Sequence, residues 1–260
     1  MGLIAGALAL YAAYGVAMIV MHPKFIYPFD PQPFEAEGFE THRFAGADGE
    51  FLTAYVHDAG PGAPVVLYLM GNVGALQYFT PMLDHHQVAG RSVVALGFRG
   101  GGGVPGQPSE TLLKSDALAL FEAYPGWLDS PGPVVVQGYS LGTGLALHVA
   151  ARRKVDGVIL SAPYARLCRL MAKAAWLPAC VMPGVQKWNS ARDAAGVKAP
   201  VLALHGTADA LVPVSEGRRL VAALPSALQV TAVEIDGAGH SDLIGFPGYL
   251  AEIDRFIEGL

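Results

Sequence analysis

The stretch 133–153, PVVVQGYSLGTGLALHVAARR, decides the fold of this 260-residue chain. Its first half is an apolar run without polar alternation, which is typical of a β-strand covered on both faces. Its second half has the apolar pattern of a helix. Between them, residues 138–142 read GYSLG, and the two glycines permit a sharp turn with close packing of helix on strand. The stretch therefore predicts a strand, a tight turn that exposes Ser140, and a helix.

Similar apolar runs recur along the chain and alternate with helical patterns. Strands are expected at 39–45, 51–57, 64–70, 92–97, 133–139, 157–162, 200–205 and 229–235, and helices at 110–124, 141–152, 215–224 and 249–260. The first two strands have no helix between them, and Asp48-Gly49 predicts a hairpin turn there. The pattern predicts an α/β fold with a mostly parallel central sheet, helices on both faces and an antiparallel edge. Residues 164–198, which are helix-rich, apolar and interrupted by prolines, are expected to form a small helical cap over the carboxyl edge of the sheet.

The N-terminal 21 residues, MGLIAGALALYAAYGVAMIVM, contain no charged or amide side chain. As a helix they are long enough to cross the roughly 30 Å hydrocarbon layer of a bilayer, which predicts a transmembrane anchor at 1–21. A cleaved secretory signal and a helix docked on the domain are the alternatives. A signal normally opens with basic residues, whereas Lys24 is the first basic residue here and follows the apolar run.

The segment after the apolar run predicts the domain boundaries and the membrane orientation. Four prolines between residues 22 and 37 predict an extended linker, which leaves 38–260 as the folded domain. The basic residues nearest the span, Lys24 and Arg43, lie on its C-terminal side and favour a cytoplasmic catalytic domain, because cytoplasmic flanks are enriched in Lys and Arg.

Composition excludes several classes of protein. The chain is 52% hydrophobic and 15% charged, with 32 glycines and 19 prolines, which fits a layered globular domain and not a disordered one. Its formal net charge of −5 provides no basic field for a phosphate backbone, so we expect no nucleic-acid partner. The two cysteines, Cys168 and Cys180, match neither a CxxC nor a zinc-binding spacing and are interpreted as small core residues.

A serine hydroxyl becomes a strong nucleophile when a base takes its proton and a third group orients that base. Asp209 lies in HGTAD just after the buried run VLAL, and His240 lies in GAGH just after the last predicted strand. The order Ser, Asp, His along the chain, with each residue at a strand end, predicts that Ser140, Asp209 and His240 act together. His85, His86 and His148 fall within helices and are expected to have packing or surface roles.

Acyl transfer also needs two backbone N–H donors that bind the developing oxyanion. Leu141 supplies one by its position directly after the serine. The other is expected from the loop after the first core strand, MGNVG, where Asn72 is favoured over Val73.

Gly101, Gly103 and Gly106 formally satisfy GxGxxG, the dinucleotide-binding pattern. Prolines crowd the required helix start and the loop does not follow the first strand, so the nucleotide interpretation is rejected.

These ordered motifs resemble those of the α/β-hydrolase superfamily, and more narrowly its membrane-anchored hydrolase-domain proteins, which are close to monoacylglycerol lipases and the prolyl-aminopeptidase-like group. The likeness runs from about residue 22 to the C-terminus through GNVG, FRGGGG followed by GQPSE, GYSLGTG, SAPY, HGTADALVP and GAGH. The resemblance implies a triad of Ser140, Asp209 and His240, with oxyanion donors from Asn72 and Leu141.

Two departures from the family pattern concern loops beside the site. Met70 stands where relatives usually have a histidine before the Gly-Asn of the oxyanion loop, and FRGGGG stands where they usually have YRG followed by an aromatic residue and a glycine. The first is expected to change how the oxyanion loop is braced and the second to loosen the neighbouring loop. Neither departure removes a catalytic group.

The sequence therefore predicts a serine hydrolase that needs no metal or cofactor and that cleaves a carboxylic ester through an acyl-enzyme on Ser140. An apolar cap beside an anchor favours a lipid-like or long-chain acyl ester over other small-molecule substrates. A peptidase or thioesterase on the same triad, and a non-catalytic scaffold that only binds a ligand or partner, are the alternatives.

Overall fold

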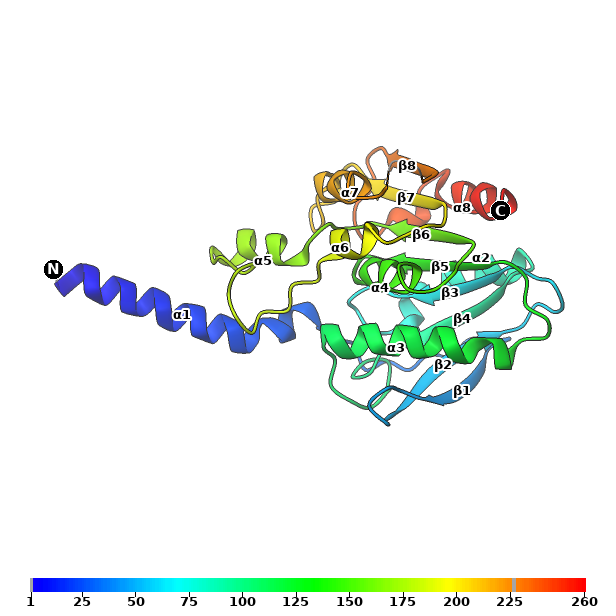
Figure 1. The fold of residues 1–260 in the computed structure, drawn as a ribbon, viewed down its shortest axis with the longest axis horizontal. Helices are drawn as coiled ribbons and strands as arrows, with labels where there is room; N and C mark the ends of the chain where they lie inside the picture. The colour runs from blue at the N-terminus through cyan, green and yellow to red at the C-terminus, as the bar shows by residue number, and fades with distance from the viewer. Residues whose placement is uncertain (1, 226–227) are drawn as a thin grey trace.

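The computed structural model describes residues 2–225 and 228–260, which form one large twisted sheet with helices on both faces (Figure 1). The strands are ordered β1-β2-β4-β3-β5-β6-β7-β8. They span Glu40–Ala45 (β1), Phe51–His57 (β2), Val65–Leu69 (β3), Ser92–Gly97 (β4), Val134–Tyr139 (β5), Gly157–Ser161 (β6), Val201–Gly206 (β7) and Val230–Ile235 (β8). The pairs β1–β2 and β2–β4 are antiparallel and the other pairs are parallel. The predicted α/β fold, with its antiparallel edge, is confirmed.

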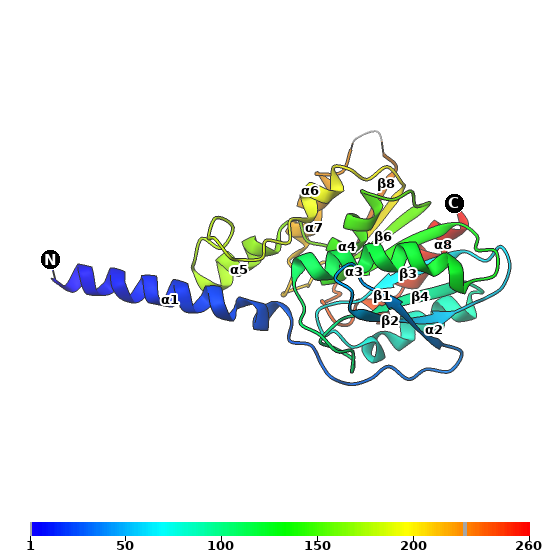
Figure 2. The same ribbon diagram turned by 60° about the horizontal axis from the view of Figure 1, so that its bottom comes forward.

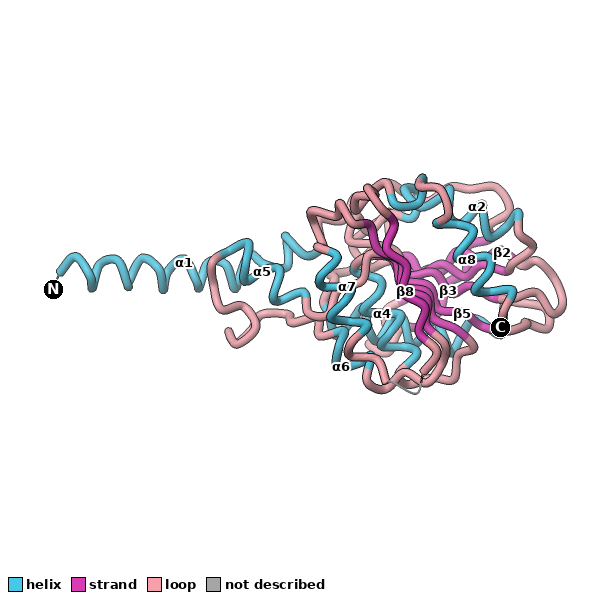
Figure 3. The backbone as a smooth tube through the Cα atoms, turned by 90° about the horizontal axis from the view of Figure 1, so that it is seen from above, coloured by secondary structure: helices cyan, strands magenta, loops and turns pink. Residues whose placement is uncertain are grey.

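Every residue of the five central strands β3, β4, β5, β6 and β7 is buried. Figure 3 shows the reason: α2 and α8 lie on one face of the sheet and α4 on the other. The helices outside the cap span Thr80–Val88 (α2), Glu110–Ala123 (α3), Leu141–Ala150 (α4), Val214–Val221 (α7) and Tyr249–Glu258 (α8). Burial on both faces explains why these strands read as continuous apolar runs.

The N-terminal helix α1 runs over Gly2–Ile26 and projects from the domain (Figures 1 and 2). It continues five residues past the expected end at Met21 and passes through Pro23. A proline leaves the carbonyl four residues earlier without its helical donor. Here that carbonyl belongs to Ile19, and the His22 Nδ1–H donates to it at 2.6 Å. The His22 side chain thus replaces the lost backbone hydrogen bond and lets the helix run on to Ile26.

The segment that follows α1 is extended, as its prolines predict, but it is packed against the domain. Tyr27 and Phe34 are buried in the main hydrophobic core. The Asp30 N–H donates to the Val73 carbonyl at 2.7 Å, and the Asp30 carbonyl accepts from the Gly102 N–H at 2.8 Å. This segment therefore braces the oxyanion loop and the glycine-rich loop after β4, instead of hanging free between helix and domain.

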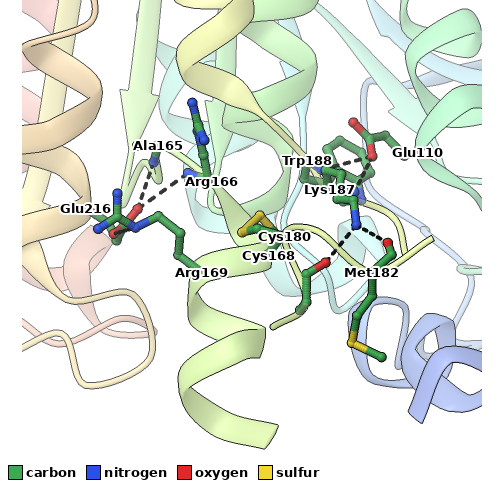
Figure 4. Close-up of a disulfide and its surroundings, with 11 residues drawn as sticks. Glu110, Ala165, Arg166, Cys168, Arg169, Cys180, Met182, Lys187, Trp188 and Glu216 are labelled. Atoms are coloured by element: carbon green, nitrogen blue, oxygen red, sulfur yellow. Dashed lines mark hydrogen bonds and ion pairs between the residues drawn. A yellow bond between two sulfur atoms is a disulfide. The ribbon is translucent and has the colours of Figure 1, made fainter. Parts of the chain in front are cut away.

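The cap contains two helices, α5 (Leu167–Ala175) and α6 (Ser190–Ala194). Only its beginning overhangs the carboxyl edge of the sheet; α5 and the loop after it run outward beside α1 (Figures 1 and 2). Cys168 and Cys180 form a disulfide across this loop, with 5.0 Å between their Cα atoms (Figure 4). Cys168 is buried, in line with the interpretation of the cysteines as small core residues, but the two are also bonded to each other, because the loop after α5 folds back and brings them together.

Side chains from the domain fix both ends of this outlying loop. The Glu216 carboxylate on α7 accepts from the backbone N–H groups of Ala165 and Arg166, at 3.3 and 3.4 Å, just before α5. Beyond the disulfide, the Glu110 carboxylate at the start of α3 accepts from the backbone N–H groups of Lys187 and Trp188, each at 2.9 Å. These contacts, drawn in Figure 4, hold the cap in place relative to the sheet.

Candidate active site

Ser140 occupies a sharp turn between β5 and α4. Its backbone has φ 49° and ψ −113°, a conformation that costs a residue with a side chain about 1–3 kcal/mol. The Ser140 N–H donates to the Ser161 carbonyl at the end of β6, at 2.8 Å. The Thr143 hydroxyl donates to the Ser140 carbonyl at 2.6 Å. These bonds hold the strained turn so that the serine side chain stands at the carboxyl edge of the sheet.

The two glycines around Ser140 are required by close backbone approach. A Cβ added at Gly142 would lie 1.9 Å from the Leu69 carbonyl oxygen, and one added at Gly138 would lie 2.4 Å from the Gly142 carbonyl oxygen. Real Cβ atoms do not approach backbone oxygens so closely, so a side chain at either position would push α4 away from the sheet. The tight packing expected from the motif is present.

The structure brings the side chains of Ser140, Asp209 and His240 together. His240 Nε2 lies 3.0 Å from Ser140 Oγ, and His240 Nδ1 lies 2.7 Å from Asp209 Oδ2. The serine follows β5, the aspartate follows β7 and the histidine follows β8, so all three stand at the same edge of the sheet. The Asp209 side chain is fully buried and that of His240 is 12% exposed. This arrangement allows the imidazole to accept the serine proton while the carboxylate binds the opposite ring nitrogen.

Asp209 is held in its charged form by several donors. Its Oδ1 accepts from the backbone N–H groups of Leu211 and Val212, at 3.0 and 2.8 Å. Burial alone would raise the pKa of Asp209, but hydrogen bonds from His205 and His240 hold that pKa well below its usual range. The carboxylate is therefore ionised at neutral pH and stabilises a positive charge on His240.

Two further side chains touch the triad and were not singled out from the sequence. His205 Nε2 lies 2.7 Å from the Val212 carbonyl and 3.5 Å from Asp209 Oδ2. The Tyr139 hydroxyl donates to the backbone carbonyl of His240. His205 is the first residue of the motif HGTAD, and Tyr139 stands directly before Ser140 in GYSLG. Their contacts, however, depend on how β5, β7 and the last loops pack, which spacing does not encode.

The predicted oxyanion donors flank the nucleophile. Leu141 begins α4, and Asn72 lines the hollow in which Ser140 lies. Among the hydrogen bonds between described residues, neither backbone N–H has a partner. Met70, in the place of the usual histidine, is 1% exposed and packs in the core, so apolar packing braces the oxyanion loop in this chain.

Two hollows meet at Ser140. The larger, of about 490 Å³, is mostly apolar, and its wall on the cap side is formed by Leu167, Leu170 and Met171 of α5. The smaller, of about 280 Å³, lies on the other side of the serine, next to His240 and the oxyanion loop. A carbonyl group bound at Ser140 therefore has separate space for its two substituents.

The remaining motif residues have structural roles away from the triad. His85 and His148 lie 2.8 and 3.3 Å from aspartates on α8 and α6, and His86 is buried against Gln137, which confirms the packing roles predicted for them. In the loop after β4, the buried Arg99 binds Asp116 at 2.7 Å through its Nε and so ties the glycine-rich segment to α3.

The mostly parallel sheet, with Ser140, Asp209 and His240 meeting where β5, β7 and β8 end, is the arrangement of an α/β hydrolase. Comparison with known proteins agrees. Residues 130–258 match the family model described as Phospholipase/Carboxylesterase. The solved structure of a Pyrococcus furiosus esterase superimposes with a TM-score of 0.71 at 19% identity, over 89% of this chain and 97% of that one, which supports the fold.

Curated relatives show the same relationship in sequence. An uncharacterized protein of Mycobacterium tuberculosis is 34% identical over 190 residues, an alignment that covers 72% of this chain and 66% of the relative, just under two thirds. The lysophosphatidylserine lipase ABHD12 of Danio rerio is 30% identical over 181 residues, which cover 60% of this chain and 46% of that protein. The chain belongs to the α/β-hydrolase superfamily.

Proposed function

We propose that this protein is a serine esterase that cleaves carboxylic esters through an acyl-enzyme on Ser140. The observation that carries the proposal is the continuous hydrogen-bond chain from Asp209 through His240 to Ser140, at 2.7 and 3.0 Å. The chain ends at a serine held on a strained turn that opens into an apolar hollow.

The proposed reaction has two halves. Ser140 Oγ attacks the ester carbonyl while His240 Nε2 takes its proton, and the resulting oxyanion binds the N–H groups of Asn72 and Leu141. Each such donor is typically worth about 3 kcal/mol of barrier. The intermediate collapses as His240 returns the proton to the leaving alkoxide, which leaves the acyl group on the serine. Water then attacks the acyl-enzyme by the same route, with His240 again as general base, and releases the acid.

The two hollows suggest which part of the ester goes where. We assign the acyl group to the larger hollow under the cap, because burial of apolar surface there gives about 25 cal/mol per Å². We assign the alcohol to the smaller hollow beside His240, from which the general acid reaches its oxygen. The apolar lining favours long acyl chains, as does the relationship to a lysophosphatidylserine lipase.

Helix α1 is long and apolar enough to cross a membrane, and we propose that it anchors the enzyme there. Two observations bear on the side of the membrane. Lys24 and Arg43, after the span, favour the cytoplasm, whereas the disulfide Cys168–Cys180 favours an oxidising compartment, because cytosolic thiols are kept reduced. The charge bias rests on two residues only, so we give the disulfide more weight and propose that the catalytic domain faces outward.

Fluorophosphonate labelling tests the catalytic serine. Wild-type protein is expected to be labelled and to hydrolyse p-nitrophenyl butyrate, and Ser140→Ala is expected to lose both. Ser215→Ala, an exposed serine on α7, serves as the matched control and is expected to behave as wild type. A folded wild-type protein without serine-dependent labelling would support the scaffold alternative, and faster cleavage of thioesters or aminoacyl amides than of esters would replace the esterase assignment.

Thiol chemistry tests the orientation. Cells quenched with a membrane-permeant maleimide before lysis are expected to yield protein whose two cysteines carry no maleimide, and reduction of that protein is expected to expose two thiols. A C-terminal alkaline phosphatase fusion, which is active only outside the cytoplasm, is expected to be active. Cysteines that carry the maleimide, together with an inactive fusion, would return the domain to the cytoplasmic side.

A further inference from the structure

A second apolar hollow lies next to the active-site hollow, between α1 and the cap. It has a volume of about 440 Å³, and its walls include Met18 and Ile19 of α1. Phe25, Met171 and Ala174 line both this hollow and the one that contains Ser140. The two hollows therefore adjoin, and together they form an apolar path from the nucleophile to the side of the N-terminal helix. We call the second hollow the α1–α5 groove.

Hydrogen bonds at one end of the groove join α1 to the cap. The hydroxyls of Tyr11 and Tyr14 donate to the carbonyls of Trp176 and Ala175, at 2.8 and 3.0 Å. These carbonyls lie at the C-terminal end of α5, where the helix offers no donors of its own. In hydrocarbon an unpaired carbonyl would cost several kcal/mol, so the two tyrosines suit this end of the cap to a lipid environment.

The length of α1 places the cap at membrane depth. Tyr11 precedes the end of the helix at Ile26 by 15 residues, or about 22 Å at 1.5 Å per residue. The part of α1 beyond this contact, Gly2–Leu10, covers about 13 Å and is too short to cross a core of about 30 Å. A spanning α1 therefore carries the tip of the cap into the adjacent leaflet. That tip is suitably apolar: Trp176 is 86% exposed and Val181 is 80% exposed.

We propose that the α1–α5 groove takes the acyl chain of a lipid ester directly from the leaflet and guides its ester group to Ser140. The inference rests on the proposed esterase function and adds the route and the class of substrate, an acyl lipid resident in the membrane. A chain that moves along the groove passes from hydrocarbon to the active-site hollow without entering water. The disulfide and the hydrogen bonds from the Lys187 ammonium to the Ala179 and Met182 carbonyls keep the loop that forms the outer wall of this path folded on itself.

The groove is tested by narrowing it at a position that does not line the active-site hollow. Met18 lines the α1–α5 groove but not the active-site hollow. Val20, on the same helix, is 73% exposed and lines neither hollow. The full chain is reconstituted in phosphatidylcholine vesicles, and kcat/KM is measured for p-nitrophenyl palmitate and p-nitrophenyl acetate. Met18→Trp is expected to lower the ratio of palmitate to acetate turnover about tenfold, as expected if about two methylene groups lose their burial. Val20→Trp is expected to leave the ratio unchanged.

The outcomes separate this inference from the proposed function. If the palmitate-to-acetate ratio were unchanged in Met18→Trp, or fell equally in both variants, the proposed role of the groove would be overturned. Wild-type protein that cleaves acetate but not palmitate would also overturn it and leave the esterase assignment intact. Wild-type protein that hydrolyses neither ester would overturn both the proposed function and the proposed role of the groove.

A measurement on the wild-type chain tests the depth of the cap without any groove variant. Vesicles that contain lipids brominated on the acyl chains are expected to quench tryptophan fluorescence, and Trp176→Phe is expected to remove most of that quenching. Trp127→Phe is the matched control, because Trp127 packs against His42 and Phe44 near the far edge of the sheet. Quenching that is absent, or that survives Trp176→Phe, would refute insertion of the cap into the leaflet.

Discussion

Replacement of Asp209 by asparagine tests the proposed chemistry more sharply than removal of the nucleophile, because it reverses one hydrogen bond and removes one negative charge while it keeps the shape of the side chain. The amide oxygen of the substituted side chain can still accept from the N–H groups of Leu211 and Val212, which bond Oδ1 in the native protein. The amide nitrogen then takes the place of Oδ2, 2.7 Å from His240 Nδ1. Because an amide nitrogen only donates, the ring must accept at Nδ1 and carry its proton on Nε2. That proton points at Ser140, 3.0 Å away, and the base is lost.

The magnitude follows from what the base contributes. General-base catalysis is worth about 10²–10⁴ in rate, and the corresponding tautomer change in a serine protease costs about 10⁴. We therefore expect kcat of Asp209→Asn to fall by about 10³–10⁴, or about 4–5 kcal/mol of barrier. KM is expected to stay within about threefold, because the substitution leaves the acyl hollow intact and a lost transition-state interaction lowers kcat alone. The rate of fluorophosphonate labelling is expected to fall in parallel.

The assay is hydrolysis of p-nitrophenyl butyrate by the full chain in detergent, with Asp242→Asn as the control. Asp242 accepts from the Gly239 N–H at 2.7 Å, so it braces the same loop without touching the imidazole. Its asparagine variant is expected to keep kcat within about threefold, since the amide oxygen can still accept that bond. If Asp209→Asn retained more than about a tenth of the activity, or if both variants fell equally, the tautomer argument would be refuted.

Three further predictions concern the framework of the site. Burial lowers the pKa of His86 to about 3. Below about pH 6.5 the unfolded chain therefore binds a proton at His86 that the folded chain does not. Between pH 7 and pH 5 the free energy of unfolding, measured by urea unfolding, is expected to fall by about 2 kcal/mol more in wild type than in His86→Gln. Gly142→Ala is expected to abolish esterase activity and to lower the free energy of unfolding by about 1–3 kcal/mol. Gly126→Ala is the control and is expected to change neither, because a Cβ at Gly126 meets nothing within 4 Å. Equal behaviour of the two variants would contradict the argument that Gly142 is required by the close approach of the Leu69 carbonyl. Tyr139→Phe removes the hydrogen bond to the His240 carbonyl. In steady-state kinetics it is expected to lower kcat about fivefold, equivalent to about 1 kcal/mol of barrier, and to leave KM unchanged. An unchanged kcat would show that this hydrogen bond does not position His240.

The central strands were predictable because burial on both faces requires continuous runs of apolar residues, which can be recognised in the sequence. The stretches 65–69 and 134–139 lie between two layers of helices, so nearly every position must be apolar, and the run itself gives the strand. The close approach of Ser140, Asp209 and His240 followed from the same reasoning, since parallel strands all end at one edge of the sheet. The order of the motifs along the chain was sufficient to predict the meeting of three residues that are up to 100 positions apart.

The cap and the anchor were less predictable because their contacts join segments without a regular period. The disulfide depends on the loop after α5 folding back, and the twelve-residue spacing of Cys168 and Cys180 alone does not predict that fold. The end of α1 was misplaced for a different reason. Pro23 normally stops a helix, but the His22 side chain satisfies the Ile19 carbonyl. His205 contacts Asp209 only through the packing of the loop after β7.

Helix α1, the proposed anchor, is also part of the wall of the candidate site. A tether can be cut at its junction with the domain without damage to the site, but α1 is more than a tether. Phe25 and Ile26, its last residues, line the hollow that contains Ser140, and the next residue, Tyr27, accepts from the Trp188 indole N–H at 3.0 Å inside the core. Because the wall of this hollow continues directly into α1, the proposed position of α1 in the bilayer would also set the height of Ser140 above the membrane. Substrates that stay at that height have the shortest path to the nucleophile.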